Sequence, residues 1–177
     1  DSGVFELLVF GGSQGASIFS EIVPAAIAKL PKEKRQRLRL VQQCRRGELR
    51  ETLDKYHQLG VEVELRDFFQ DMPHRMSEAH LIVCRSGAST VSELAVMGRP
   101  SVLVPLPGAL DQDQMANAVQ LTNHQGAHLV EQRLFTPDKF AALLEEFMDT
   151  PKLLDVMATK AKKRGVPDAT LNLTQFA

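Results

Sequence analysis

Short apolar runs alternate with longer amphipathic stretches along the chain, and the two kinds of segment have different periods. The short runs contain β-branched residues and are flanked by polar or glycine-containing segments, so each predicts a strand. The predicted strands cover residues 5–10, 38–42, 61–65, 81–84, 101–105 and 128–130. Apolar and acidic residues alternate at 61–65, which is typical of a strand at the edge of a sheet.

The stretches between these strands carry the spacing and the end signals of helices. Glycine follows three of them, at positions 60, 98 and 126, and Thr136 followed by Pro137 is a typical helix start. The predicted helices cover residues 16–30, 48–59, 90–97, 111–123, 137–148 and 151–163, with a further candidate at 168–176. This alternation of strands and helices predicts an α/β fold with a mostly parallel sheet.

Composition narrows the class of protein. The length of 177 residues fits one domain, and 44% hydrophobic with 24% charged residues is typical of a soluble globular chain. Basic and acidic side chains number 21 and 22, and no basic stripe is visible, which argues against a nucleic-acid binder. No apolar run approaches the roughly 18 residues of a membrane span.

Cysteines and histidines give no sign of a metal or redox site. Cys44 and Cys84 lack C-x-x-C spacing and lie at the ends of apolar runs, so we expect both to be buried and reduced, as in a cytoplasmic protein. The five histidines have no metal-ligand spacing. We therefore expect neither a metal nor a cofactor.

The first candidate site is the sequence Gly-Gly-Ser-Gln-Gly-Ala at 11–16, between a predicted strand and a predicted helix. Small residues let the backbone approach an anion, and the helix start offers unpaired N–H groups to a phosphate. The glycine spacing matches neither the dinucleotide fingerprint nor the Walker loop. A tight turn that needs glycine for packing explains the pattern equally well.

The second candidate site, Arg-Ser-Gly-Ala-Ser-Thr-Val-Ser-Glu at 85–93, also follows a strand and opens a helix. At the carboxyl edge of a sheet the two loops can face one crevice, where open α/β sheets bind nucleotides. Glu93 can accept hydrogen bonds from both hydroxyls of a ribose. Capping of the helix by Ser89 or Thr90 is an alternative that is compatible with binding.

The third candidate site follows Pro105 and places Gln114 and Asn117 three residues apart on one helix face. Amides both donate and accept hydrogen bonds, which suits sugar hydroxyls. Two alternatives stay open: a capping box between Asp111 and Gln114, and a metal-binding D-x-D formed by Asp111 and Asp113.

Together these motifs resemble the MurG family, the undecaprenyl-diphospho-muramoylpentapeptide N-acetylglucosaminyltransferases. The resemblance also includes Gly-Arg-Pro at 98–100 and Gly-x-Pro-Asp-Ala at 165–169, and runs from about residue 4 to the end. It implies a Rossmann-like domain with helices on both faces, the C-terminal domain of a GT-B glycosyltransferase. Residues 1–177 would form this single UDP-sugar-binding domain, with the N-terminal acceptor domain absent from the chain.

The resemblance also implies a role for individual residues. Ser13 and Gln14 would lie by the diphosphate, the backbone of Phe69 would read uracil with Met72 nearby, and Gln114 would bind the sugar. The full set of implied substrate-binding residues is Ser13, Gln14, Phe69, Met72, Ala88, Ser89, Thr90, Val91, Ser92, Glu93, Gln114 and Asn117. No catalytic residue is expected here, because the base would belong to the N-terminal domain. Asp113 departs from the family pattern, in which His, Asn or Gln is common.

The implied reaction transfers N-acetylglucosamine from UDP-N-acetylglucosamine to the C4 hydroxyl of lipid I, forming lipid II in peptidoglycan synthesis. The implied partners are the nucleotide sugar, lipid I through the N-terminal domain, and the cytoplasmic face of the bacterial inner membrane, with no nucleic acid. Two alternatives stay open: half of another GT-B transferase that uses a different UDP-sugar, and a non-catalytic nucleotide-binding module.

Overall fold

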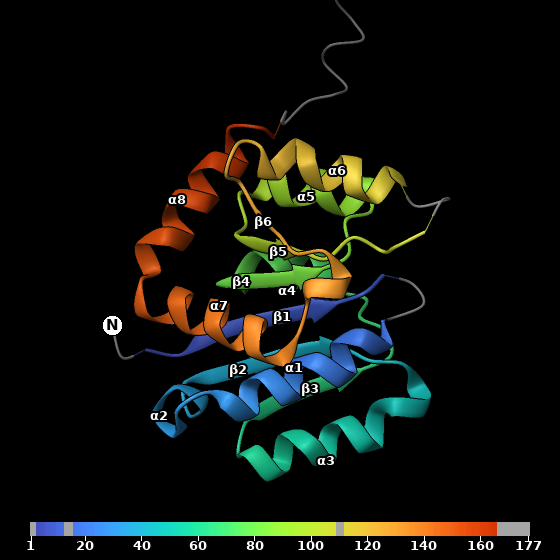
Figure 1. The fold of residues 1–177 in the computed structure, drawn as a ribbon, viewed down its shortest axis with the longest axis vertical. Coiled ribbons are helices and arrows are strands. Elements are labelled where there is room, and N and C mark those ends of the chain that lie inside the picture. Colours follow the sequence, from blue (N-terminus) through green and yellow to red (C-terminus); the bar gives the residue numbers. More distant parts are fainter. Residues whose placement is uncertain (1–2, 13–15, 109–111, 166–177) are drawn as a thin grey trace, which may run out of the picture.

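Six parallel strands form the central sheet of the protein (Figure 1). The structure is a computed structural model and describes residues 3–12, 16–108 and 112–165. The strands are β1 (Phe5–Phe10), β2 (Leu38–Gln43), β3 (Glu62–Arg66), β4 (Leu81–Cys84), β5 (Ser101–Leu103) and β6 (His128–Leu129). All six strands predicted from the hydrophobic pattern are confirmed, and β3 lies at an edge of the sheet as expected.

The strand order is β3-β2-β1-β4-β5-β6, so the chain builds outward from β1 in one direction and then in the other. In this register Leu7 of β1 lies opposite Leu40 of β2 and Leu81 of β4. The order reverses between β1 and β4, and an open α/β sheet forms a crevice at such a point, outside the carboxyl ends of its strands. The topology therefore places the loops that follow β1 and β4 beside one another.

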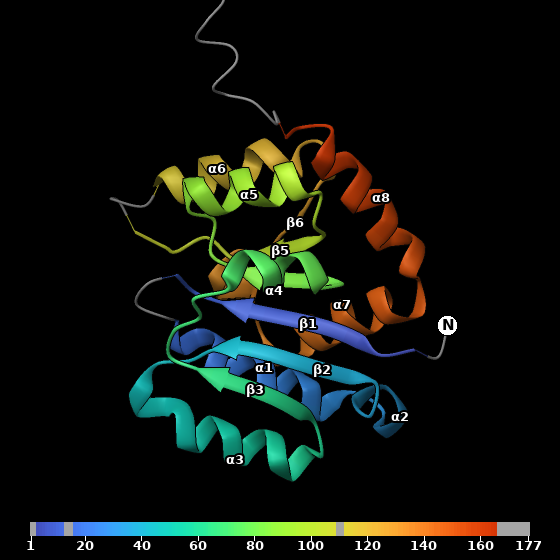
Figure 2. The same ribbon diagram turned by 180° about the vertical axis from the view of Figure 1, so that it is seen from behind.

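Helices cover both faces of this sheet. Figures 1 and 2 show α1 and α7 on one face and α4 on the other, while α8 runs along the edge where the strands begin. The α-helices are α1 (Ser17–Lys29), α2 (Lys32–Arg35), α3 (Leu49–Leu59), α4 (Met72–Glu78), α5 (Ala88–Met97), α6 (Gln112–Thr122), α7 (Pro137–Asp149) and α8 (Pro151–Lys162). Two 3₁₀ helices, η1 (Arg46–Glu48) and η3 (Gln132–Leu134), lie in connections.

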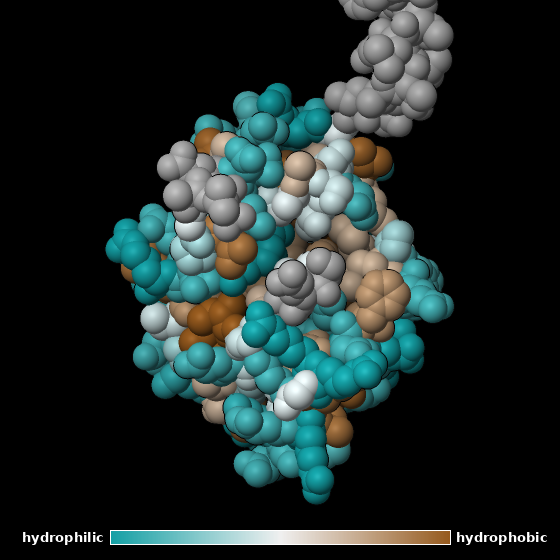
Figure 3. All heavy atoms as spheres, turned by 90° about the vertical axis from the view of Figure 1, so that its right-hand side faces the viewer, coloured by the Kyte–Doolittle hydropathy of each residue, from teal (hydrophilic) through white to brown (hydrophobic). Residues whose placement is uncertain are grey.

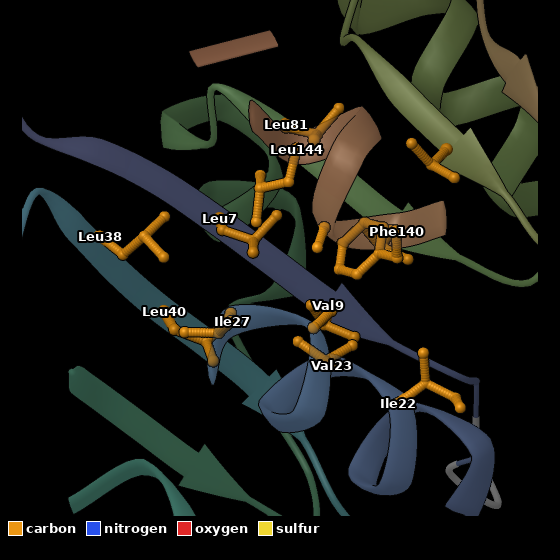
Figure 4. Close-up of a cluster of buried hydrophobic side chains, with 14 of the residues drawn as sticks. Leu7, Val9, Ile22, Val23, Ile27, Leu38, Leu40, Leu81, Phe140 and Leu144 are labelled. Carbon is orange, nitrogen blue, oxygen red and sulfur yellow. The ribbon is translucent and has the colours of Figure 1, made fainter. Parts of the chain in front are cut away.

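The larger hydrophobic core lies between the sheet and helices α1, α3 and α7. Figure 4 shows Val23 and Ile27 of α1 and Phe140 of α7 in one cluster of buried side chains against the strands. A smaller core on the opposite face joins the sheet to α4, α5 and α6. Helix α8 contributes to both, since Leu154 belongs to the first core and Ala161 to the second.

The sequence pattern missed α2 and α4 and predicted the other helices to within a few residues. Helix α4 has seven residues, mostly polar, with Pro73 in its first turn, so it has too little apolar periodicity to be recognised. Thr136 accepts a hydrogen bond from the backbone N–H of Lys139 (3.3 Å) and caps α7 as predicted. The candidate helix at 168–176 lies outside the described residues.

Two glycines that were predicted to end helices have different roles. Gly98 adopts a left-handed conformation (φ 65°) directly after α5, as a C-terminal cap does. After α6 the residue with a positive φ, of 58°, is Gln125. The prediction that Gly126 would end this helix as a glycine cap is therefore wrong. A Cβ at Gly126 would lie 2.9 Å from the Cα of Ala161, so this glycine permits close contact with α8.

Candidate functional site

A cavity of about 490 Å³ opens at the carboxyl edge of the sheet, where the loops after β1, β2, β4 and β5 meet the start of α6. Figure 3 looks onto this edge, where polar side chains cover most of the surface and hydrophobic patches are separate from one another. The residues that line the cavity include Gly11, Gly12, Arg45, Arg85, Leu106 and Gln114. Its position is where an open α/β sheet binds nucleotides.

The two loops expected to face one crevice do so. Gly12, after β1, and Arg85, after β4, line the same cavity, because these two strands are neighbours in the sheet. Ser13 and Gln14, which were predicted to lie by a diphosphate, fall outside the described residues. The glycine turn is thus placed at the cavity by Gly11 and Gly12.

Arg85 brings positive charge to this cavity and is held in position by several groups. Its guanidinium donates to the backbone carbonyls of Val104 (3.1 Å) and Pro105 (3.3 Å) and lies 5.5 Å from the centre of the Phe19 ring. A guanidinium is the side chain best suited to phosphate recognition. Arg45, on the loop after β2, adds a second guanidinium to the cavity lining.

Helix α5 begins two residues earlier than its predicted start at Thr90. Its N-cap position is Gly87, and no side chain caps the helix, so the expectation that Ser89 or Thr90 would do so is wrong. These two residues lie inside the first turn, where backbone N–H groups have no partner within the helix. An uncapped start at the carboxyl edge of the sheet leaves such donors available to an anion.

The remaining predicted residues of α5 divide by exposure. Ser92 and Glu93 are exposed, together with Ala88 and Ser89. Val91 is buried in the core, and its N–H donates to the carbonyl of Gly87 (3.0 Å). Of the residues assigned to a ligand, Val91 therefore has side chain and backbone both engaged within the protein.

Gln114 and Asn117 connect α6 to the loop after β4. The Gln114 Oε1 accepts from the backbone N–H groups of Leu106 (3.0 Å) and Ser86 (3.3 Å). The backbone carbonyl of Gln114 accepts from the Ser86 hydroxyl (2.6 Å). Asn117 Nδ2 donates to the Ser86 carbonyl (3.2 Å). These contacts use the oxygen of the Gln114 amide and fix its orientation, so Nε2 is the atom with which Gln114 can serve a ligand.

Of the two residues in the capping box proposed for α6, Gln114 is described and Asp111 lies outside the described residues. In such a box the Gln114 Oε1 would accept a hydrogen bond at the start of the helix, but here it accepts from the backbone N–H groups of Ser86 and Leu106. Asp113 is exposed in the first turn of α6. Within residues 3–12, 16–108 and 112–165, no three His, Cys, Asp or Glu side chains are grouped as metal ligands.

Phe69 lies in the connection between β3 and α4, and Met72 is the first residue of α4; both are at the same edge of the sheet but outside the cavity lining. Phe69 is 4% exposed, and the guanidinium groups of Arg75 and Arg66 lie 5.1 Å and 5.7 Å from its ring centre. The side chain therefore packs within the protein, as expected if only its backbone meets a ligand. Phe68, its neighbour, is 64% exposed.

Arg75 holds this connection against the edge strand. It forms a two-pronged ion pair with Glu64 of β3 and donates to Asp71 (2.9 Å) at the start of α4. The hydrogen bond from Arg75 lowers the pKa of Glu64 below its ordinary value. Through these contacts Arg75, which belongs to α4, binds to β3 and packs against the Phe69 ring.

Replacing Arg75 with methionine is expected to lower the free energy of unfolding at pH 7. The Glu64 pair is partly exposed and screened by solvent, so its loss should cost about 0.5–1 kcal/mol. Because the pKa of Glu64 is lowered in the folded protein, this stabilisation is present above the pKa of the unfolded chain and is lost as pH falls through the folded value. Urea unfolding of both proteins at pH 7 and pH 3 measures it, and an undiminished difference at pH 3 would exclude the ionic contribution.

Sequence reasoning assigned no role to Arg45 or Arg75. Arg45 lies two residues beyond β2 at the carboxyl edge, and a basic residue a few positions after a predicted strand was a usable signal. Arg75 had no such signal, because its partner Glu64 is remote from any recognisable motif. Cys44 and Cys84 are buried and form no disulfide, as predicted. Burial raises the pKa of the Cys84 thiol.

A second cavity, of about 500 Å³, lies at the opposite edge of the sheet, where the strands begin. Its lining includes Phe5 of β1, Arg99 before β5 and Leu154 of α8. None of the three candidate-site motifs contributes to its described lining; the Gly-Arg-Pro segment at 98–100, which belongs to the family resemblance, does. The carboxyl-edge cavity is the candidate site because it gathers the motif residues at the reversal of strand order.

No helix in the described ranges is both long and apolar enough to cross a membrane.

Comparison with known proteins shows which proteins the chain is similar to. Residues 6–173 match the model of the glycosyltransferase family 28 C-terminal domain. MurG of Acinetobacter baumannii has the same fold, with a TM-score of 0.87 and 34% identity over 97% of this chain and 51% of that one.

Two curated relatives are UDP-N-acetylglucosamine–N-acetylmuramyl-(pentapeptide) pyrophosphoryl-undecaprenol N-acetylglucosamine transferases. That of Methylorubrum extorquens is 54% identical over 92% of this chain, and that of Brucella suis is 48% identical over 98%. The chain spans 44% and 46% of the length of these relatives. It belongs to the glycosyltransferase family 28 C-terminal domain family, with an α/β fold shared with MurG.

Proposed function

We propose that this chain is the donor-binding domain of an inverting glycosyltransferase that moves N-acetylglucosamine from UDP-N-acetylglucosamine to lipid I. The observation that carries the proposal is the meeting of the loops after β1 and β4 around one cavity at the reversal of strand order. The relatives to which the chain is similar are named as transferases of N-acetylglucosamine from UDP-N-acetylglucosamine to N-acetylmuramyl-(pentapeptide) pyrophosphoryl-undecaprenol, and the chain spans less than half of each.

The diphosphate would bind between the glycine turn at Gly11 and Gly12 and the uncapped start of α5. Backbone N–H donors fixed in the folded protein stabilise a developing negative charge without having to reorganise. Arg85 and Arg45 add positive charge to the same cavity. In this arrangement the domain assists departure of UDP when the acceptor hydroxyl attacks the anomeric carbon and inverts its configuration.

The rest of the donor would extend along the carboxyl edge. The exposed carboxylate of Glu93 is suited to accept hydrogen bonds from the ribose hydroxyls, and the backbone near Phe69 to pair with uracil. Gln114 would donate from Nε2 to a hydroxyl of the sugar, with Asn117 beside it. We expect lipid I and the cytoplasmic face of the membrane to be bound by another domain, which would also supply the catalytic base.

Replacing Glu93 with alanine is expected to weaken UDP-N-acetylglucosamine binding by about 1–3 kcal/mol, the value of a hydrogen bond to a charged group. Isothermal titration of the chain with the nucleotide sugar measures the change. Glu33→Ala is a matched control, because Glu33 is also exposed on a helix but lies in α2, at the opposite edge of the sheet. Equal affinity of folded Glu93→Ala and wild-type protein would exclude the ribose contact, and absence of binding to the wild type would exclude the proposed function.

A further inference from the structure

Gln43 is the last residue of β2, which lies between β3 and β1 in the sheet. Its side chain is 5% exposed, although it is polar and stands at the edge of the sheet where the candidate site lies. Burial of an amide costs free energy unless its donor and acceptor atoms find partners. Its partners therefore indicate what the residue holds in position.

The amide of Gln43 joins the loops that follow the two neighbouring strands. Its Oε1 accepts from the backbone N–H of Gly11 (3.4 Å), in the turn after β1. Its Nε2 donates to the carbonyl of Asp67 (3.2 Å), in the connection that leads to Phe69. One side chain thus spans from the glycine turn to the segment whose backbone is proposed to meet uracil.

We propose that Gln43 is a positioning residue that sets the spacing between the diphosphate-binding turn and the base-binding segment. The inference rests on the proposed function. In a uridine diphosphate the ribose fixes the distance from base to diphosphate, so both protein segments must be held at a matching separation. A separation set before binding avoids the entropic cost of ordering the two loops around the ligand.

The chemistry of the bridge requires an amide. One end must accept from an N–H and the other must donate to a carbonyl, which glutamine does and glutamate does not. In Gln43→Glu a carboxylate oxygen would face the Asp67 carbonyl, so the donor half of the bridge is lost. In Gln43→Met the length of the side chain is kept and both hydrogen bonds are lost.

Gln42 provides a matched control within the same strand. It is 0% exposed, and because successive residues of a strand point to opposite faces, its side chain lies in the core, where it accepts from the Tyr56 hydroxyl (2.5 Å). Gln42→Met therefore removes a buried amide of the same type without touching either loop. It should lower stability and leave ligand affinity within twofold of the wild type.

The experiment titrates wild-type, Gln43→Met, Gln43→Glu and Gln42→Met chains with UDP, uridine and pyrophosphate, following backbone amide signals by NMR. For both Gln43 variants we expect affinity for UDP to fall about tenfold, as the loss of one or two hydrogen bonds predicts. Affinities for uridine and for pyrophosphate, each of which needs only one of the two segments, should change less than twofold. Hydrogen exchange of the Gly11 amide without ligand should be faster in Gln43→Met.

A purely structural role would weaken all three ligands by the same factor, and this result would overturn the proposal. So would UDP affinity within twofold of the wild type in either folded Gln43 variant, or an equal loss of UDP affinity in Gln42→Met. If the wild-type chain bound no UDP, the proposed function itself would fail, and the positioning role with it. If Gln43→Met does not fold, Gln43→Glu carries the same comparison.

Discussion

Replacing Phe19 with alanine is expected to lower the free energy of unfolding by about 3–5 kcal/mol, the usual cost of removing a buried aromatic ring. Phe19 is fully buried in the larger core, where its ring packs edge-on against Phe135 with centroids 5.8 Å apart. The same ring lies beneath the guanidinium of Arg85, so its removal also loosens a residue of the cavity. Guanidinium chloride unfolding followed by circular dichroism gives the difference in stability.

Phe68→Ala is the control for this substitution, because it removes the same side chain from an exposed position. We expect it to change stability by no more than about 0.5 kcal/mol, as exposed positions usually do. An unfolding midpoint of Phe19→Ala equal to that of Phe68→Ala would contradict the packing described around α1.

Replacing Gln114 with leucine is expected to reduce both stability and donor binding. The backbone N–H of Ser86, a residue with 0% exposure, would lose its acceptor, and leaving a buried donor unpaired costs about 1–3 kcal/mol. The Leu106 N–H loses the same acceptor. The loop after β4 would no longer be fixed to α6 through this side chain, and affinity for UDP-N-acetylglucosamine should fall with it.

Gln114→Glu separates the two effects. A carboxylate still accepts from both loop N–H groups, so stability should stay within about 0.5 kcal/mol of the wild type. The donor at Nε2 is lost and a negative charge enters the cavity proposed to hold the diphosphate, so affinity for UDP-N-acetylglucosamine should fall about tenfold or more. Gln120→Glu, on an exposed position of the same helix, is the control, and titration with wild-type affinity in Gln114→Glu would exclude the sugar contact.

Elements whose signals are local were predictable from the sequence. The segment Leu81–Cys84 is short and apolar, and it forms β4 with the predicted bounds. Gly60 ends α3 in a left-handed conformation (φ 66°), because only a residue without a Cβ adopts it without strain. Helix α4 was missed because seven residues with few apolar side chains give no helical period.

The location of the candidate site could be predicted from the sequence, but most of its individual hydrogen bonds could not. That loops after two parallel strands share one edge follows from the strand pattern, and Gly12 and Arg85 do meet there. The spacing of Gln114 and Asn117 indicated two amides on one face of a helix, but their bonds to Ser86 depend on where α6 lies against β4. The Gln43 bridge likewise depends on the order of the first three strands, which no local pattern encodes.

Helix α8 has a consequence for how the molecule comes apart. With Leu154 in one core and Ala161 in the other, it joins the two hydrophobic layers along the edge opposite the carboxyl-edge cavity. Detachment of this helix exposes apolar surface above and below the sheet at once, so neither layer can open alone from that side. We therefore expect local opening of low free energy to start elsewhere than at this edge of the sheet.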